Sequence, residues 1–123
     1  MQPSSYSEAW ARRWAARQAA YEEERRAVYS RLEAKLATAA ELLRSQGVRQ
    51  AWLYGSFLDG TWRPDSDVDL AVEPGPDSPR NLFRLEAALE DLLSQTVHLT
   101  VLRVLPPAIQ EVIRQEGRRL VGP

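Results

Sequence analysis

The stretch from Gly55 to Leu70 constrains this chain most, because it combines a strand break, two closely spaced acidic residues and an apolar alternation. The run Ala-Trp-Leu-Tyr at 51–54 precedes it and ends at a glycine, which is typical of a buried strand breaking into a turn. Residues 67–72 (DVDLAV) then alternate with the period of a strand that has one buried face. Asp67 and Asp69 are therefore predicted to share the other face, with Cα atoms roughly 6.6 Å apart.

This acidic pair indicates a metal site. Two carboxylates at such a spacing can converge on a divalent cation, whereas without a cation they repel and raise each other's pKa. Gly55 lets the backbone approach a ligand closely, and a helical turn that begins at Ser56 would offer its hydroxyl and free N–H groups to a phosphate. The two halves together predict a nucleoside triphosphate held by backbone donors and by carboxylate-bound Mg²⁺.

The spacing resembles the signature of the DNA polymerase β-like nucleotidyltransferases: Gly55-Ser56, ten intervening residues, then Asp67-Val68-Asp69. The more detailed sequence pattern of this stretch is similar to that of the minimal nucleotidyltransferases (MNT proteins), which are often paired with HEPN partners. The residues that carry this finer resemblance are Gly60, Pro64, Ser66 and Leu70. The competing interpretation is a surface hairpin with acidic turns, and the spacing between two strand-like runs favours the family over it.

The resemblance implies a third carboxylate on the next core strand, where this chain has Val97-His98-Leu99. By alternation, His98 and Thr100 are predicted on the polar face of that strand, beside Asp67 and Asp69. Mg²⁺ seldom binds imidazole, so one metal position would be weakened, whereas histidine can accept a proton near neutral pH. Two interpretations of His98 stay open, a catalytic base and a hydrogen-bonded structural residue.

The loop between the two halves departs from the family pattern at one position. Asp59 stands where many MNT proteins have arginine before the glycine, and Arg63 is the candidate for supplying that positive charge to the nucleotide. Trp62 is interpreted as a core or interface residue rather than one that stacks on a base. Asp65, next to Pro64, is interpreted as a turn residue.

Residues 7–46 contain neither glycine nor proline and predict one long helix that ends at Gly47. The half from about Val28 is expected to pack on the sheet. For the first half two interpretations stay open: it docks onto a second protein or a second copy of the chain, or it bends over its own domain. Its arginines are interrupted by Glu22, Glu23 and Glu24, which favours a solvated, ion-paired surface over a nucleic-acid face.

Further patterns predict strands near 49–54, 67–73 and 97–101, and helices near 78–93 and 106–116. This order predicts an α/β (α+β) domain, in which helices pack against a small mixed sheet of about three strands. The resemblance identifies this arrangement with the nucleotidyltransferase fold. We expect residues 1–123 to form a single domain, with a long N-terminal helix at 1–47 and a catalytic core at 48–120.

Composition excludes several function classes. The chain has no cysteine, which excludes disulfides and cysteine metal sites. Its net charge of -1 gives no global attraction to nucleic acid. No apolar run approaches the length of a membrane span, and the N-terminus lacks the apolar core of a secretory signal, so the expected compartment is the cytoplasm.

The resemblance implies Mg²⁺-dependent transfer of AMP from ATP, or of another nucleoside monophosphate from its triphosphate, to a hydroxyl on a protein partner. It also implies an antitoxin role, in which an MNT protein adenylylates or sequesters a HEPN ribonuclease. The expected residues form a nucleotide-binding group and a metal-binding group for a two-metal site: Gly55, Ser56 and Arg63, and Asp67 and Asp69. His98 is expected to assist weakly or to act as the base. The alternative is a binding module with weakened chemistry that docks a HEPN ribonuclease toxin, or pairs with a second copy, through the long helix.

Overall fold

The computed structural model describes residues 5–122; residue 123 and residues 1–4, with which the predicted N-terminal helix begins, lie outside this range. The elements are α1 (Ser5–Ser45), β1 (Val48–Tyr54), α2 (Ser56–Asp59), β2 (Val68–Pro74), α3 (Phe83–Leu93), β3 (Val97–Val101), the 3₁₀ helix η1 (Leu102–Val104), α4 (Pro107–Glu116) and β4 (Arg118–Val121). The mixed α/β class is confirmed, but the sheet has four strands where about three were predicted.

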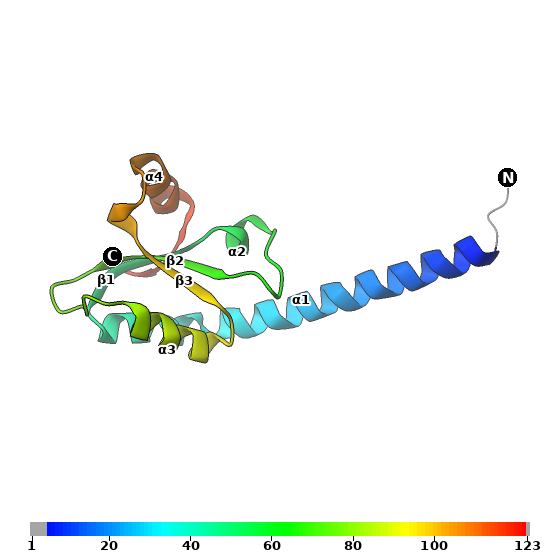
Figure 1. Ribbon diagram of the computed structural model, residues 1–123, viewed down its shortest axis with the longest axis horizontal. Coiled ribbons are helices and arrows are strands. Elements are labelled where there is room, and N and C mark those ends of the chain that lie inside the picture. Colours follow the sequence, from blue (N-terminus) through cyan, green and yellow to red (C-terminus); the bar gives the residue numbers. More distant parts are fainter. Residues whose placement is uncertain (1–4, 123) are drawn as a thin grey trace.

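The first half of α1 projects away from the domain (Figure 1). Trp10 and Trp14 on this projecting part are 56% and 52% exposed. Arg25 ties the helix to the domain, since its guanidinium donates hydrogen bonds to the carbonyls of Trp62 (2.8 Å) and Gly60 (2.9 Å). Because this half projects into solvent, the interpretation that it bends over its own domain is wrong. The physical reason is that the helix contains no glycine or proline at which it could kink. Neither α1 nor any other helix within residues 5–122 is both long and apolar enough to cross a membrane.

The sheet has the order β3-β2-β1-β4. β1 is antiparallel to β2 and β4, whereas β2 and β3 are parallel. α1 and α3 lie on one face and α4 lies on the other (Figure 1). α4 packs mainly over β1 through Ile113 and Trp52, and it leaves the same face of β2 and β3 less covered.

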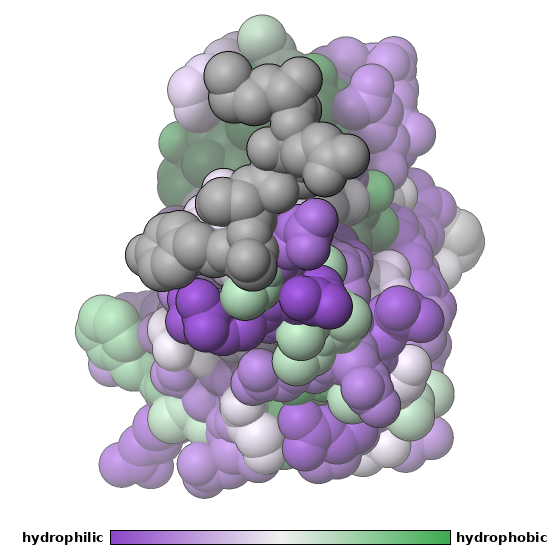
Figure 2. Space-filling view, turned by 90° about the vertical axis from the view of Figure 1, so that its right-hand side faces the viewer, coloured by the Kyte–Doolittle hydropathy of each residue, from purple (hydrophilic) through white to green (hydrophobic). Residues whose placement is uncertain are grey.

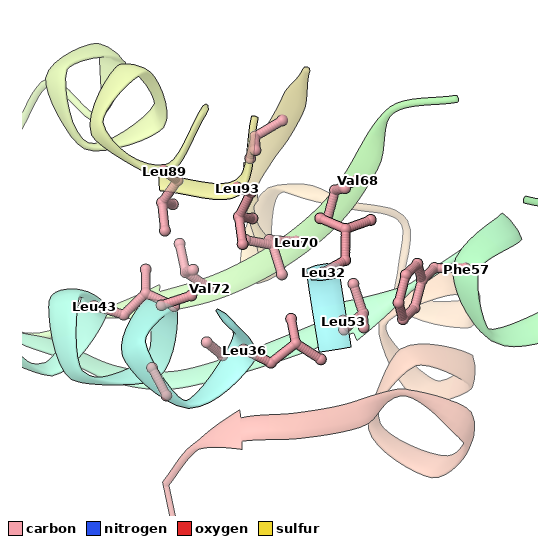
Figure 3. Close-up of a cluster of buried hydrophobic side chains, with 14 of the residues drawn as sticks. Leu32, Leu36, Leu43, Leu53, Phe57, Val68, Leu70, Val72, Leu89 and Leu93 are labelled. Atoms are coloured by element: carbon pink, nitrogen blue, oxygen red, sulfur yellow. The ribbon is translucent and has the colours of Figure 1, made fainter. Parts of the chain in front are cut away.

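The main core lies between the sheet and the helices α1 and α3, where leucines of both helices meet apolar residues of β1 and β2 (Figure 3). Val68, Leu70 and Val72 of β2 point into this core and are at most 1% exposed. Burial of each such side chain stabilises the fold by roughly 1.5–3 kcal/mol. Because strand residues alternate, this burial directs Asp69 to the opposite, less covered face.

β4 is the strand that the sequence analysis does not predict. It has four residues, two of which are exposed arginines, and it pairs only with β1 at the edge of the sheet. Arg118 forms an ion pair with Glu33 of α1 at 2.5 Å, and the Arg119 guanidinium lies 5.5 Å from the centre of the Trp52 ring. Short, charged edge strands are common because they resist pairing with other chains, and the same features remove the apolar alternation by which a strand is recognised.

Candidate active site

Gly55 turns the chain sharply from β1 into α2. Its φ of 79° and ψ of -146° lie in a region that residues with a side chain rarely adopt. A Cβ at this position would lie 2.5 Å from Oδ2 of Asp69, so the absence of a side chain is what lets this carboxylate sit against the turn. The Gly55 carbonyl accepts hydrogen bonds from the N–H groups of Leu58 (3.0 Å) and Asp59 (3.3 Å), which closes the short helix.

Strand pairing brings Asp69 between Tyr54 of β1 and His98 of β3, its partners in the sheet register. The His98 Nδ1 lies 3.7 Å from the Asp69 Oδ1, and the His98 side chain is 64% exposed. Asp67 lies just before β2 rather than within it, and it is exposed. The structure therefore brings together Gly55, Asp69 and His98 directly, with Asp67 at the open edge of the same site.

Burial raises the pKa of Asp69 above its ordinary value, and the negative charge of Asp67 raises it further, while the charge and hydrogen bond of His98 act in the opposite direction. Burial also raises the pKa of Tyr54; a hydrogen bond with Thr100 lowers it, and the Asp69 charge raises it. Tyr54 is a site neighbour that the sequence analysis does not single out. The signal was available, because the last residue of β1 faces the start of β2 across an antiparallel pair.

This donor set suits Mg²⁺, which is usually held by one or two carboxylates together with substrate phosphates and water. Asp67 and Asp69 would supply the carboxylates, and a partly desolvated carboxylate with a raised pKa, such as Asp69, gains from a nearby cation. Within residues 5–122, no group of three or more acidic or histidine side chains could hold a metal by itself. Any Mg²⁺ at this site would therefore take further ligands from the nucleotide or from water. The two-metal site stays a prediction.

Ser56 and Arg63 occupy different surroundings. Ser56 is the partly buried first residue of α2, directly after the Gly55 turn. Arg63 is exposed, and its backbone forms a turn with Ser66: the Arg63 N–H donates to the Ser66 Oγ (3.0 Å) and the Ser66 N–H donates to the Arg63 carbonyl (2.9 Å). The structure thus fixes the backbone of Arg63 and leaves its charge at the surface beside the site loop.

Two other loop residues have structural roles. Trp62 is fully buried and packs edge-on against the rings of Tyr29 and Phe57, so it is a core residue, as the sequence analysis favours. Asp59 accepts hydrogen bonds from the N–H (2.9 Å) and the hydroxyl (2.6 Å) of Thr61, and these bonds lower its pKa. The acidic residue at the position of the usual arginine therefore closes the loop locally.

Residues 37–122 match the family described as polymerase β, nucleotidyltransferase. The chain belongs to this family. The match covers the sheet, α2, α3, α4 and the end of α1, including every candidate site residue. The projecting half of α1 lies outside it.

Individual relatives of this nucleotidyltransferase agree with that assignment. A provisionally named protein adenylyltransferase of Methanocaldococcus jannaschii is 30% identical over 77 residues, which cover 62% of this chain and 83% of the relative. A solved structure described as a minimal nucleotidyltransferase is 32% identical, with a TM-score of 0.63 over 72% of this chain and 92% of the other. A toxin–antitoxin structure with AMP-PNP is 29% identical, with a TM-score of 0.57 over 68% of this chain and 69% of the other.

Asp69→Asn should raise the melting temperature of the nucleotidyltransferase at pH 7, without Mg²⁺, by roughly 1–3 °C. The folded protein raises the pKa of Asp69, so this group's contribution to stability is fully present below its unfolded pKa and is lost as the pH rises through the folded value. The gain of the variant should therefore shrink as the pH falls towards about 4, where about half of the unfolded carboxyl is also protonated. Thermal denaturation from pH 4 to 8 measures this, with the exposed turn variant Asp65→Asn as control. A gain that does not depend on pH would contradict the assignment.

Proposed function

We propose that this nucleotidyltransferase transfers AMP from ATP to a hydroxyl group, most simply on a protein, and releases pyrophosphate. The observation that carries the proposal is the contact between the Gly55 turn and the Asp69 carboxylate, because it puts a phosphate-binding turn and a cation ligand side by side. The relative named as a protein adenylyltransferase and the structural neighbour that contains AMP-PNP support adenine nucleotide as the donor.

In this proposal the residues around Gly55 position the triphosphate. The Ser56 hydroxyl and the backbone N–H groups at the start of α2 bind the β and γ phosphates, and the exposed Arg63 adds positive charge. Asp67 and Asp69 would hold Mg²⁺, which would neutralise phosphate charge and stabilise the entering and leaving oxygens. The protein contributes mainly by positioning the reactants and by stabilising the charge of the transition state. Transfer of a phosphate-type group does not require a covalent intermediate with a side chain.

His98 accepts the proton of the attacking hydroxyl. The acceptor oxygen forms a bond to the α phosphorus, the bond from that phosphorus to the β-phosphate oxygen breaks, and pyrophosphate leaves. The proton moves to the neutral imidazole, and Asp69, 3.7 Å away, stabilises the resulting positive charge. The exposure of His98 lets a large acceptor reach it from solvent.

Label transfer from ATP carrying ³²P at the α phosphate tests the proposed reaction. Asp67→Asn and Asp69→Asn should each lower transfer by roughly 100-fold or more, because each removes one of the two charged cation ligands. Asp65→Asn removes an exposed carboxylate from the same loop and should leave the rate unchanged. The proposal fails if the wild-type protein transfers no label to itself or to candidate partner proteins and Asp67→Asn alters neither Mg²⁺ nor ATP binding.

His98→Ala should lower the rate of transfer by roughly 100-fold, the usual contribution of a general base. His98→Asp restores the carboxylate implied by the family pattern, so it should recover most of this loss and tighten Mg²⁺ binding. The measurement is the rate of ³²P transfer by the wild type and both variants at one pH, together with their Mg²⁺ affinity. Equal rates for the wild type and His98→Ala would assign His98 a structural role.

A second function, docking of a protein partner, is favoured by the projecting half of α1. Trp10, Trp14 and Tyr21 are exposed there, and an isolated helix gains much of its stability in water from packing against something. Two structural neighbours are toxin–antitoxin assemblies at 29% and 24% identity, and the first of these supports a toxin-type protein partner. The HEPN ribonuclease class of this partner is what the sequence resemblance implies. A second copy of this chain is the other candidate partner for this surface of α1.

The double variant Trp10→Ala/Trp14→Ala should leave the melting temperature of the domain within about 1 °C of the wild type, because both side chains lie on the projecting half of α1. It should weaken assembly by roughly tenfold or more, as loss of large aromatic anchors usually does. Light scattering after size-exclusion chromatography, of the chain alone and with an all-helical ribonuclease partner, measures this. Phe83→Ala, which removes a 75% exposed aromatic side chain elsewhere, is the control. Unchanged assembly of the double variant would exclude this surface.

A further inference from the structure

A basic pocket of about 570 Å³ lies where β1 begins and β2 ends. Its lining consists of three arginines from three different elements, one carboxylate and two uncharged residues: Arg49, Arg103, Arg114, Glu73, Gln50 and Pro74. Three positive charges and one negative charge give this lining a net charge of +2. None of the roles assigned above uses this basic pocket.

The basic pocket opens on the same face of the sheet as the candidate active site. Asp69, Ala71 and Glu73 alternate along β2 and therefore share a face. Ala71 is buried there with Trp52 and Ile113, beneath α4. Since a strand rises about 3.3 Å per residue, Glu73 lies roughly 13 Å from Asp69 along β2. An acidic centre and a basic centre thus lie on one face of the sheet.

The guanidinium groups of the basic pocket have no internal counter-ion. In the part of the chain that the structure describes, residues 5–122, Arg49, Arg103 and Arg114 form no ion pair with any carboxylate, Glu73 included. A guanidinium group presents its N–H donors in a planar fork that matches the two oxygens of a carboxylate. The pocket is therefore suited to an anion that comes from outside the domain.

The structure supports two of these arginines from behind. The Gln110 side-chain amide donates hydrogen bonds to the carbonyls of Arg103 (3.3 Å) and Leu105 (2.8 Å), which ties η1 to α4. A Cβ at Gly75 would lie 2.9 Å from the Cγ of Arg49, so the stem of this arginine packs against a residue without a side chain. Such support lowers the entropy cost of holding the guanidinium groups around one anion.

The basic pocket is distant from the projecting half of α1. Figure 1 shows the start of β1 at the left, whereas the projecting half of α1 extends to the right. The view in Figure 2 faces that right-hand end, where hydrophilic residues cover most of the lower part of the surface. A ligand of the basic pocket and a partner of the α1 surface can therefore be tested separately.

The charges around the basic pocket favour an acidic protein segment over a nucleic acid. Two carboxylates would balance the net charge of its lining. A nucleic-acid strand carries a negative charge on every nucleotide, so a strand leading from the pocket to the candidate active site would be repelled by Glu73, Asp69 and Asp67. In a protein segment, uncharged residues can fill this interval.

We propose that the basic pocket binds carboxylates of an acidic segment in the protein that receives the AMP. An extended segment rises about 3.3 Å per residue, so the acidic residues would lie roughly four residues from the hydroxyl that reacts. The inference rests on the proposed function and adds a feature by which the site would select its acceptor.

Fluorescence anisotropy with two labelled peptides tests the basic pocket without Mg²⁺ or ATP. Each peptide has one tyrosine and, beyond three alanines, two glutamates or two glutamines, and each is made in both chain directions. The wild type should bind the glutamate peptide roughly tenfold more tightly than the glutamine peptide. Arg103→Gln/Arg114→Gln should remove this preference, because it removes two of the three guanidinium groups. The control Arg13→Gln/Arg17→Gln removes the same charge from the exposed surface of α1 and should keep it.

Glu73→Gln provides a test that loss of folding cannot imitate. It removes the one carboxylate of the basic pocket, so it should bind the glutamate peptide roughly threefold more tightly than the wild type. Thermal denaturation of each variant confirms that it is folded, and Arg103→Gln alone repeats the test if the double variant is not.

The outcomes distinguish this inference from the proposed function. Equal affinities of the wild type for the two peptides, or an equal loss in the α1 control, would overturn the inference. So would tighter binding of a uridine oligonucleotide through the same arginines, because the pocket would then hold a phosphate backbone. The proposed transfer is measured separately with ³²P-labelled ATP. If neither peptide is labelled while arginine-dependent binding persists, the transfer is contradicted and the basic pocket remains assigned to acidic segments.

Discussion

The close approach of the Gly55 turn to the Asp69 carboxylate is the constraint on which the site depends. It requires a left-handed residue without a side chain at the end of β1 and an acidic residue near the start of β2. Antiparallel pairing of β1 with β2 aligns the two, and parallel pairing of β2 with β3 adds His98 on the other side. Two strand registers and one glycine thus assemble a polar centre from residues up to 43 positions apart in the sequence.

The helices determine which face of the sheet can carry this centre. α1 and α3 bury the apolar side of β2, while α4 packs mainly over β1 and leaves the polar side of β2 and β3 accessible. Asp69 is nevertheless partly desolvated, which raises its pKa and lowers the stability of the free protein at neutral pH. Such a group is costly for folding alone, and it becomes useful when a cation or a protonated base is present.

Much of this arrangement could be predicted from local patterns. The absence of glycine and proline predicted α1, alternation predicted three strands, and the same alternation placed His98 beside Asp69. β4 was missed because Arg118 and Arg119 conceal a strand whose pairing is decided by tertiary contact. The Asp59 turn, and the groove between Leu58 of α2 and Val112 of α4, depend on tertiary contacts between segments that are distant in the sequence. A periodic sequence pattern does not predict such contacts.

The length of the projecting half of α1 also limits how a partner could be positioned. At 1.5 Å per residue, the stretch from Trp10 to Arg25 is roughly 22 Å long, and Arg25 anchors its inner end to the loop at Gly60 and Trp62. In the proposed function, the projecting half of α1 would therefore set the distance between a docked partner and the candidate active site. A partner bound at Trp10 and Trp14 could place a hydroxyl near His98 only if the partner itself spans that distance. Partners that are too small would then be bound without being modified.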